Sequence, residues 1–284
     1  MARTLFVGDS HSYGYQTSNT KDAKGKALFW QDNNFAEIYA ELNEKPVAIY
    51  AMPGASNQHY VSWVKTFLDY YDDVDELFVQ FTYWTRYMLA TNTSAQPFVN
   101  SWKSNAFAFG PNNLPPEYEN KPNVDRWQDD YEPDGEQKEY IVHFEPRQHV
   151  NYEEQAWPGK EVTKPFFYTH LWHNTLTHIK YRQVCADFFI IDRLCEQRGI
   201  NWHLFRMNDR IFVPDNPNYF GELTNCKSYN IMAVQDWFKE TKGIDIETKE
   251  YMYDEEHYNY DIHLNIAKEY IPYLQDANKS DTPL

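Results

Sequence analysis

The sequence predicts an α/β protein of three layers, in which helices cover both faces of a mainly parallel sheet of about five strands. Two observations predict this class. Over the first 90 residues, short apolar runs alternate with segments of helical periodicity, which is the pattern of parallel β–α–β units. The chain has 284 residues, of which 18% are aromatic, and it can therefore bury a core of its own.

The first half of the core alternates strands with helices. Short apolar runs bounded by turn-forming residues predict buried strands at 5–7, 46–52 and 77–81. Between these strands, apolar side chains recur at helical spacing over 35–42 and 57–71. We expect Asp32 or Asn33 to cap the first of these two helices.

The second half of the core resumes after residue 163. An apolar stripe predicts a long helix that Gly199 ends, and alternating residues at 202–207 predict a fourth strand. Residues 243–253 are interpreted as a short strand. The predicted helices of this half are 166–198, 231–238 and 262–274.

Residues 92–163 break the pattern and are interpreted as an insertion. Prolines recur there without any helical or strand period. Between Glu117 and Glu161 stand 13 acidic and 5 basic residues, so this stretch carries −8 of the total net charge of −16. Long irregular segments within a compact domain are usually functional. We therefore predict an α/β core at 1–91 and 164–284, with an acidic, aromatic and cap-like insertion at 92–163.

Composition excludes several classes of protein. A net charge of −16 argues against nucleic acid and anionic membranes as partners, because both require basic surfaces. No apolar run is long enough to span a bilayer. The three cysteines suit neither a disulfide framework nor a thiolate zinc site, and we expect no metal and no cofactor. No secretory signal precedes the first strand, so the expected location is the cytoplasm or a virion.

Polar residues follow the predicted strands where a functional site is expected. In an open α/β sheet, ligands bind beyond the carboxyl ends of the strands. The first strand ends in Gly8-Asp9-Ser10, the second runs into Pro53-Gly54, and the third is followed by 82–86. Asp261 and His263 open the last predicted helix. A serine, an oxyanion-binding turn and an Asp/His pair are therefore expected at one edge of the sheet.

These motifs resemble those of a known family. Phe6-Val7-Gly8-Asp9-Ser10 after the first strand, with Asp261-Ile262-His263-Leu264-Asn265 near the C-terminus, is similar to the SGNH or GDSL hydrolases. The resemblance covers the core but not the insertion. It implies a flavodoxin-like fold with strand order 2-1-3-4-5 and a serine ester hydrolase that needs no cofactor. A phage-encoded member of the family is the expected origin.

The resemblance implies a role for each motif. Ser10 would be the nucleophile and His263 the base that removes its proton, since a serine hydroxyl alone is a poor nucleophile. Asp261 would orient the imidazole. The backbone N–H groups of Ser10 and Gly54 would stabilise the oxyanion.

The sequence departs from the family after the third strand, where the usual oxyanion-hole Asn is missing. Thr82 or Thr85 could place a hydroxyl there, and Asn57 could reach in from the neighbouring turn. The Asp and His are also one residue closer together than is usual. Asp254-Glu255-Glu256-His257 has the longer spacing, but the His-Leu-Asn that opens a helix favours His263.

The remaining expectations concern substrate and partners. Asp9, His11, Trp84 and Arg86 are predicted to contact substrate, with Arg86 facing an anionic group. Acyl esters, acetyl esters among them, are the predicted substrates, either small molecules or a carbohydrate that the aromatic residues of the insertion could receive.

The alternative prediction is a protein without enzymatic activity. The missing Asn also suits a structural or attachment protein of a virion or another large assembly, one that keeps the SGNH-like fold. Its partners would then be other proteins of that assembly. Labelling of Ser10 by a fluorophosphonate probe distinguishes the two hypotheses.

Overall fold

The computed structural model describes the α/β core and a few strands of the insertion. The described residues are 2–13, 34–51, 55, 57–82, 87–91, 108–109, 123–129, 140–144, 174–207, 223, 225–226, 232–252 and 257–276.

The core is a parallel sheet of five strands, with a short antiparallel strand at one edge. The strand order in the described part is β5-β6-β2-β1-β3-β8. The strands are β1 (Arg3–Gly8), β2 (Val47–Ala51), β3 (Val74–Phe81), β5 (Ala108–Phe109), β6 (Val124–Asp129) and β8 (Asn201–Arg206). A separate antiparallel pair joins β4 (Tyr87–Thr91) to β7 (Tyr140–Phe144).

The order of the strands confirms part of the expected topology and corrects the rest. The run β2-β1-β3-β8 agrees with the first four positions of the expected order 2-1-3-4-5. Beyond β8, the described residues contain only a single parallel bridge, between Trp202 and Cys226. The fifth parallel strand is instead β6, which pairs with β2 at the opposite edge. Since β6 comes from the 92–163 segment, that segment contributes a strand to the core sheet.

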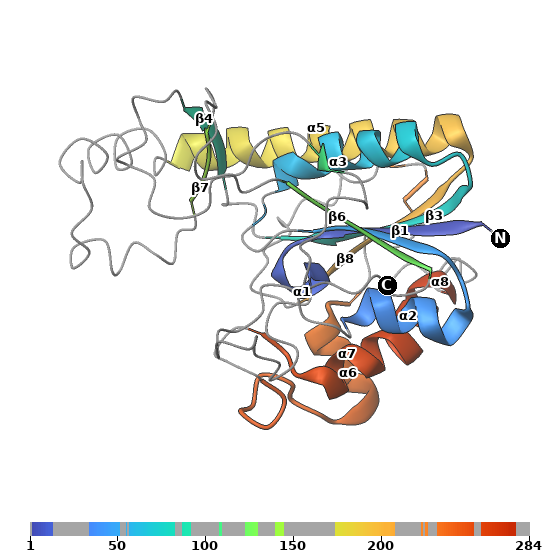
Figure 1. Ribbon diagram of the computed structural model, residues 1–284. Coiled ribbons are helices and arrows are strands. Elements are labelled where there is room, and N and C mark those ends of the chain that lie inside the picture. The colour runs from blue at the N-terminus through green and yellow to red at the C-terminus, as the bar shows by residue number, and fades with distance from the viewer. Residues whose placement is uncertain are drawn as a thin grey trace, which may run out of the picture.

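Helices form a layer on each face of the sheet (Figure 1). Helices α3 (Asn57–Tyr70) and α5 (Asn174–Arg198) lie side by side over one face. The other face is covered by α2 (Phe35–Asn43), α6 (Val234–Lys242) and the C-terminal helical segment. That segment consists of α7 (Tyr260–Asn265), the π-helical turn η6 (Ile266–Tyr270) and α8 (Ile271–Asp276). The predicted three-layer α/β class is therefore confirmed.

The helix positions follow the sequence pattern closely, with differences at the ends. The N-cap of α2 is Asn34 rather than Asp32 or Asn33, and its side-chain oxygen accepts the Glu37 N–H. Gly199 follows α5 with a positive φ of 67°, as predicted for a residue that ends a helix. In place of the expected short strand, residues 243–251 are irregular or form turns, and Met252 makes a single bridge to Tyr258. No helix among the described residues is both long and apolar enough to cross a membrane.

Alternation along the strands divides the core into two halves. Leu5 and Val7 face α3 and α5, whereas Phe6 between them packs against the rings of Phe35, Tyr39 and Phe78 on the other side. This is the two-residue period of a strand that is buried on both faces. Helices therefore pack against both faces of the sheet, and the carboxyl ends of its strands provide a rigid platform for a site.

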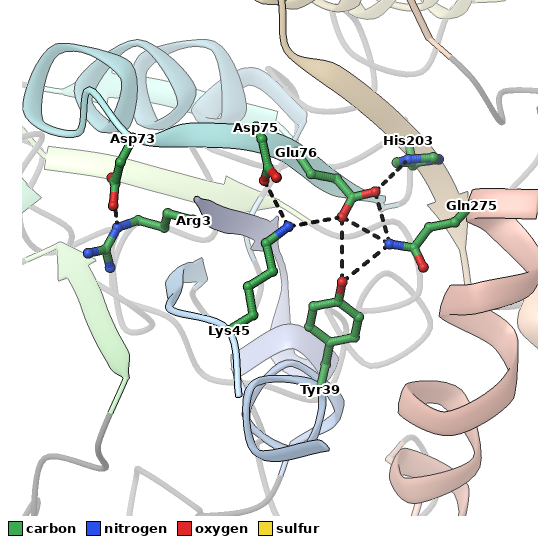
Figure 2. Close-up of polar contacts among 8 residues, drawn as sticks. All are labelled: Arg3, Tyr39, Lys45, Asp73, Asp75, Glu76, His203 and Gln275. Carbon is green, nitrogen blue, oxygen red and sulfur yellow. Dashed lines mark hydrogen bonds and ion pairs between the residues drawn. The ribbon is translucent and has the colours of Figure 1, made fainter. Parts of the chain in front are cut away.

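A polar cluster closes the opposite, amino edge of the sheet (Figure 2). Glu76 of β3 lies at its centre and accepts hydrogen bonds from Gln275 of α8, at 3.0 Å to both carboxylate oxygens. His203 of β8 lies 3.2 Å from the same carboxylate, and Lys45 lies 3.8 Å from it. The cluster thereby joins the end of the C-terminal helical segment to the amino end of β3, an inner strand of the sheet.

Candidate active site

Ser10 lies in a tight turn directly after β1, where α1 (Ser10–Tyr13) begins. The turn is possible because residue 8 is a glycine. A Cβ atom on Gly8 would lie 2.1 Å from the Ser12 hydroxyl oxygen and 2.8 Å from Gln80 Oε1, too close for either atom. Ser12 donates from both its N–H and its hydroxyl to Gln80 Oε1, and so folds the turn back over Gly8. The Gly-Asp-Ser motif thus sets the shape of this turn.

The Asp9 carboxylate anchors the turn to the neighbouring strand. It accepts hydrogen bonds from the Gln80 amide, from the Thr82 hydroxyl at 2.8 Å and from the His11 N–H at 3.1 Å. Asp9, Gln80 and Thr82 are all buried, so water does not compete for these bonds. Asp9 was predicted to bind substrate. The hydrogen bonds given above connect the ends of β1 and β3, and the substrate-binding role of Asp9 stays a prediction.

Asn57 and Thr82 meet where the oxyanion-hole Asn of the family was expected. The Asn57 side chain accepts the Thr82 N–H at 3.1 Å and donates to the Thr82 carbonyl at 3.0 Å. An amide nitrogen carries two hydrogens, so one remains to be donated to another group. The Thr82 hydroxyl has a single hydrogen, and it is directed to Asp9. Of these two predicted donors, the geometry favours Asn57.

His263 is buried in α7 with one ring nitrogen bound and the other without a partner. Its Nδ1 accepts the Phe35 N–H at 3.1 Å, so the neutral ring carries its proton on Nε2. No hydrogen-bond partner for Nε2 exists within the described part of the chain. Burial, together with the like charges of His11 and His257, holds the pKa of His263 well below its usual range. A neutral ring with this tautomer offers a donor at Nε2, whereas a base must offer a lone pair there.

Asp261 is exposed in the first turn of α7. Its backbone carbonyl accepts the Asn265 amide at 2.7 Å. Within the described residues, the hydrogen bond of His263 Nδ1 is to Phe35 and not to Asp261. The predicted Asp261–His263 hydrogen bond is therefore not made in this structure. A carboxylate in the first turn of a helix instead interacts favourably with the helix dipole.

A second histidine lies against the residue that follows Ser10. The ring of His257 is 5.4 Å from the ring of His11, and the neighbouring Tyr258 ring is 5.2 Å from it. His257 precedes Asn259, which caps α7, so it lies on the loop before the helix rather than within it. Although three histidines gather here, the described residues contain no group of His, Cys, Asp or Glu arranged to hold a metal.

Several predicted site residues lie outside the described residues. They are Gly54, Trp84, Thr85 and Arg86, together with Asp254 of the alternative Asp/His pair. Their predicted roles stay predictions, as does the role of His11 in binding substrate.

Two residues of the site were missed in the sequence. Gln80 was read only as the end of an apolar strand, yet its amide binds both Asp9 and Ser12. Asn34 was overlooked in favour of its neighbours, yet its amide donates to the Ser12 carbonyl at 3.0 Å. A polar residue at an otherwise apolar strand end was the available signal for Gln80. Asn34 gave only an ordinary capping signal.

Comparison with solved structures finds weak matches to two carbohydrate esterases. An acetyl xylan esterase, Est2A from the rumen bacterium Butyrivibrio proteoclasticus, matches at 12% identity with a TM-score of 0.43. The match covers 97% of this chain and 64% of that one. A carbohydrate esterase whose active site is described as having divergent catalytic and non-catalytic binding functions matches at 10% identity, with a TM-score of 0.43 and coverage of 97% and 65%. This chain thus spans slightly less than two thirds of either protein. No protein-family model and no curated protein matches the sequence.

Proposed function

We propose that this chain is a serine ester hydrolase in which Ser10 attacks the acyl carbon of its substrate. The observation that carries the proposal is the turn after β1. Gly8 allows the chain to fold tightly, the buried Asp9 carboxylate fixes the turn to β3, and Ser10 begins the short helix that follows. A nucleophile held on a rigid turn at the carboxyl edge of a parallel sheet is well placed for acyl transfer, which needs the reacting groups to be firmly positioned.

The general base in this proposal is His257, in place of His263. His257 lies against His11, the residue next to Ser10, whereas His263 Nδ1 is committed to the Phe35 N–H. The spacing Asp254-Glu255-Glu256-His257 also agrees with the longer interval that is usual in the SGNH hydrolases. Asp254 would then orient the ring, as Asp does in other serine hydrolases.

The reaction follows from these roles. His257 removes the proton of the Ser10 hydroxyl as its oxygen bonds to the acyl carbon, and returns that proton to the departing alcohol. Water, activated by the same ring, then hydrolyses the acyl-enzyme. The Ser10 N–H and the second hydrogen of the Asn57 amide stabilise the oxyanion in both steps. Acetyl and other acyl esters of carbohydrates are the substrates proposed here, on the aromatic composition of the 92–163 segment.

Hydrolysis of p-nitrophenyl acetate tests the nucleophile. We expect turnover by the wild-type protein, fluorophosphonate labelling at Ser10, and neither property in Ser10→Ala, because the variant lacks the proposed nucleophilic hydroxyl. Circular dichroism of the variant controls for folding. A folded Ser10→Ala protein with wild-type turnover would exclude Ser10. A wild-type protein that neither turns over ester nor reacts with the probe would favour the structural or attachment protein.

A matched pair of variants tests the base. His257→Asn should lower kcat/KM by about 10²- to 10⁴-fold, the usual contribution of a general base. His263→Asn keeps a side-chain oxygen that can accept the Phe35 N–H, and it should cause a much smaller loss. The reverse ranking of the two variants would restore His263 as the base.

A further inference from the structure

Two asparagines next to the proposed site have the same pair of contacts. Each is the N-cap of a helix: Asn34 accepts the Glu37 N–H at 3.0 Å before α2, and Asn259 accepts the Ile262 N–H at 3.3 Å before α7. Each also uses its amide nitrogen to bind a carbonyl of a distant segment. One carbonyl belongs to the turn that carries Ser10, and the other lies on the segment just before His257.

Asn34 binds the turn that carries the nucleophile. Its amide donates to the Ser12 carbonyl at 3.0 Å, two residues after Ser10. The Ser12 N–H and hydroxyl are already bound to Gln80, so the backbone of residue 12 is held both from the sheet and from α2. Asn34 is fully buried, and water cannot replace its bonds.

Asn259 binds the loop that carries the proposed base. Its amide donates to the Glu250 carbonyl at 2.9 Å, and its N–H donates to the Tyr251 carbonyl at 2.8 Å. An antiparallel bridge between Met252 and Tyr258 lies just inside these bonds. His257 directly precedes Tyr258, so this bridge lies next to the proposed base.

The presence of asparagine at both N-caps points to a second role, because capping alone needs only a hydrogen-bond acceptor. Ser, Asp and Asn cap a helix about equally well. Only Asn combines a capping oxygen with an amide that donates in the opposite direction. At both positions the second contact uses that donor.

We propose that Asn34 and Asn259 are positioning residues that set the place of the Ser10 turn and of the His257 loop relative to each other. This inference rests on the proposed function for its catalytic consequence. Neither asparagine needs to touch the substrate. Each joins the start of a helix, which the core fixes, to one half of the reacting pair.

Serine substitutions separate the two contacts of each asparagine. Asn34→Ser and Asn259→Ser keep a capping oxygen but lose the amide donor. We expect kcat to fall roughly 10- to 100-fold with KM nearly unchanged, because small misplacements of reacting groups have effects of this size. Asn43→Ser is the matched control, since it removes a similar amide-to-carbonyl bond, to Tyr39, at the far end of α2. Its kcat should equal that of the wild-type protein.

Hydrogen exchange supplies a readout that is independent of activity. Exchange in Asn34→Ser should accelerate in peptides covering residues 8–13 but not in α2, and in Asn259→Ser it should accelerate in residues 250–258. Unchanged exchange in these peptides, or wild-type labelling of Ser10 by the fluorophosphonate probe in both variants, would overturn the positioning role. Absence of labelling in the wild-type protein would instead overturn the proposed function, and the exchange result would still decide whether the asparagines hold these segments.

Discussion

At the residue scale, Gly8 controls the packing around Ser10, the proposed nucleophile, most directly. Ser12 and Gln80 occupy the space where any side chain on residue 8 would lie. Gly8→Ala must therefore displace the Ser12 hydroxyl, which breaks the bond that folds the turn. We expect a loss of about 1–3 kcal/mol in the free energy of unfolding from overpacking, and loss of Ser10 labelling. Urea denaturation and fluorophosphonate labelling measure the two effects.

Gly199→Ala serves as the control for this substitution. Gly199 has a φ of +67°, but nothing lies within 4 Å of the Cβ that alanine would add. The expected cost is about 1–2 kcal/mol of backbone strain, with no change in labelling. Full labelling of Ser10 in Gly8→Ala would contradict this prediction, because it would show that Ser10 stays reactive when Ser12 is displaced.

The residue scale also shows which site residues could be predicted from sequence. Ser10 was predicted as the nucleophile because a glycine, an acidic residue and a serine directly follow an apolar strand, and this role stays a prediction. The choice between His257 and His263 was harder, since both precede an Asn in a similar local sequence. It depends on where α7 begins. A cap by Asn259 places His263 inside the helix and His257 before it, and sequence periodicity does not fix a helix end within a few residues.

At the element scale, β6 is joined to α2 by a fully buried ion pair. Arg126 of β6 donates to Glu37 of α2 from Nε at 2.9 Å and also from a terminal nitrogen, and neither side chain is exposed. Glu37 lies in the first turn of α2, next to the Asn34 cap. The pair therefore connects the edge of the sheet to the helix that holds the Ser10 turn.

Single and double substitutions separate the two parts of this contact. Arg126→Met should lower the free energy of unfolding by about 3–5 kcal/mol, because it leaves the Glu37 charge buried and unpaired. The double variant Glu37→Leu with Arg126→Met should recover most of that loss, since apolar replacement of a buried pair is often neutral. Denaturation in urea measures both. Equal losses in the single and double variants would contradict the coupling.

The same ion pair explains why β6 was not predicted. The sequence Val-Asp-Arg-Trp-Gln-Asp places charged residues where a central strand is normally apolar. Its burial depends on Glu37, which is 89 residues away in the sequence. The strands β1, β2 and β3 were predicted because their apolar runs carry the signal locally. A strand that owes its burial to a distant partner carries no such signal.

At the scale of the whole molecule, two buried groups predict that acid lowers stability. Burial and the neighbouring histidines lower the pKa of His263, so the unfolded chain binds this proton at a higher pH than the folded protein does. Burial alone would raise the pKa of Glu76, but hydrogen bonds from His203 and Gln275 outweigh it and hold the pKa below its usual value. For both groups, stability is present above the pKa of the unfolded chain and is lost as the pH falls.

The expected loss has two stages, which urea denaturation between pH 8 and pH 3 can separate. The first begins below about pH 6.5, the usual pKa of histidine, and His263→Asn should reduce it. The second begins near the usual pKa of a glutamate, about 4.5, and Glu76→Gln should reduce it. A pH profile identical to the wild type in both variants would show that neither group carries the dependence.

The position of β6 beside β2 limits which deletions in the 92–163 segment the chain can tolerate. Without residues 124–129, the N–H and C=O groups of β2 that now pair with β6 would lie open along one side of the sheet. An uncovered strand edge is a template for pairing with other chains and so promotes aggregation. We therefore expect the chain to tolerate deletions in the 92–163 segment that leave residues 124–129 in place, and to aggregate when a deletion removes them. The strand β6, although it comes from the 92–163 segment, therefore protects the core sheet from pairing with other copies of this chain.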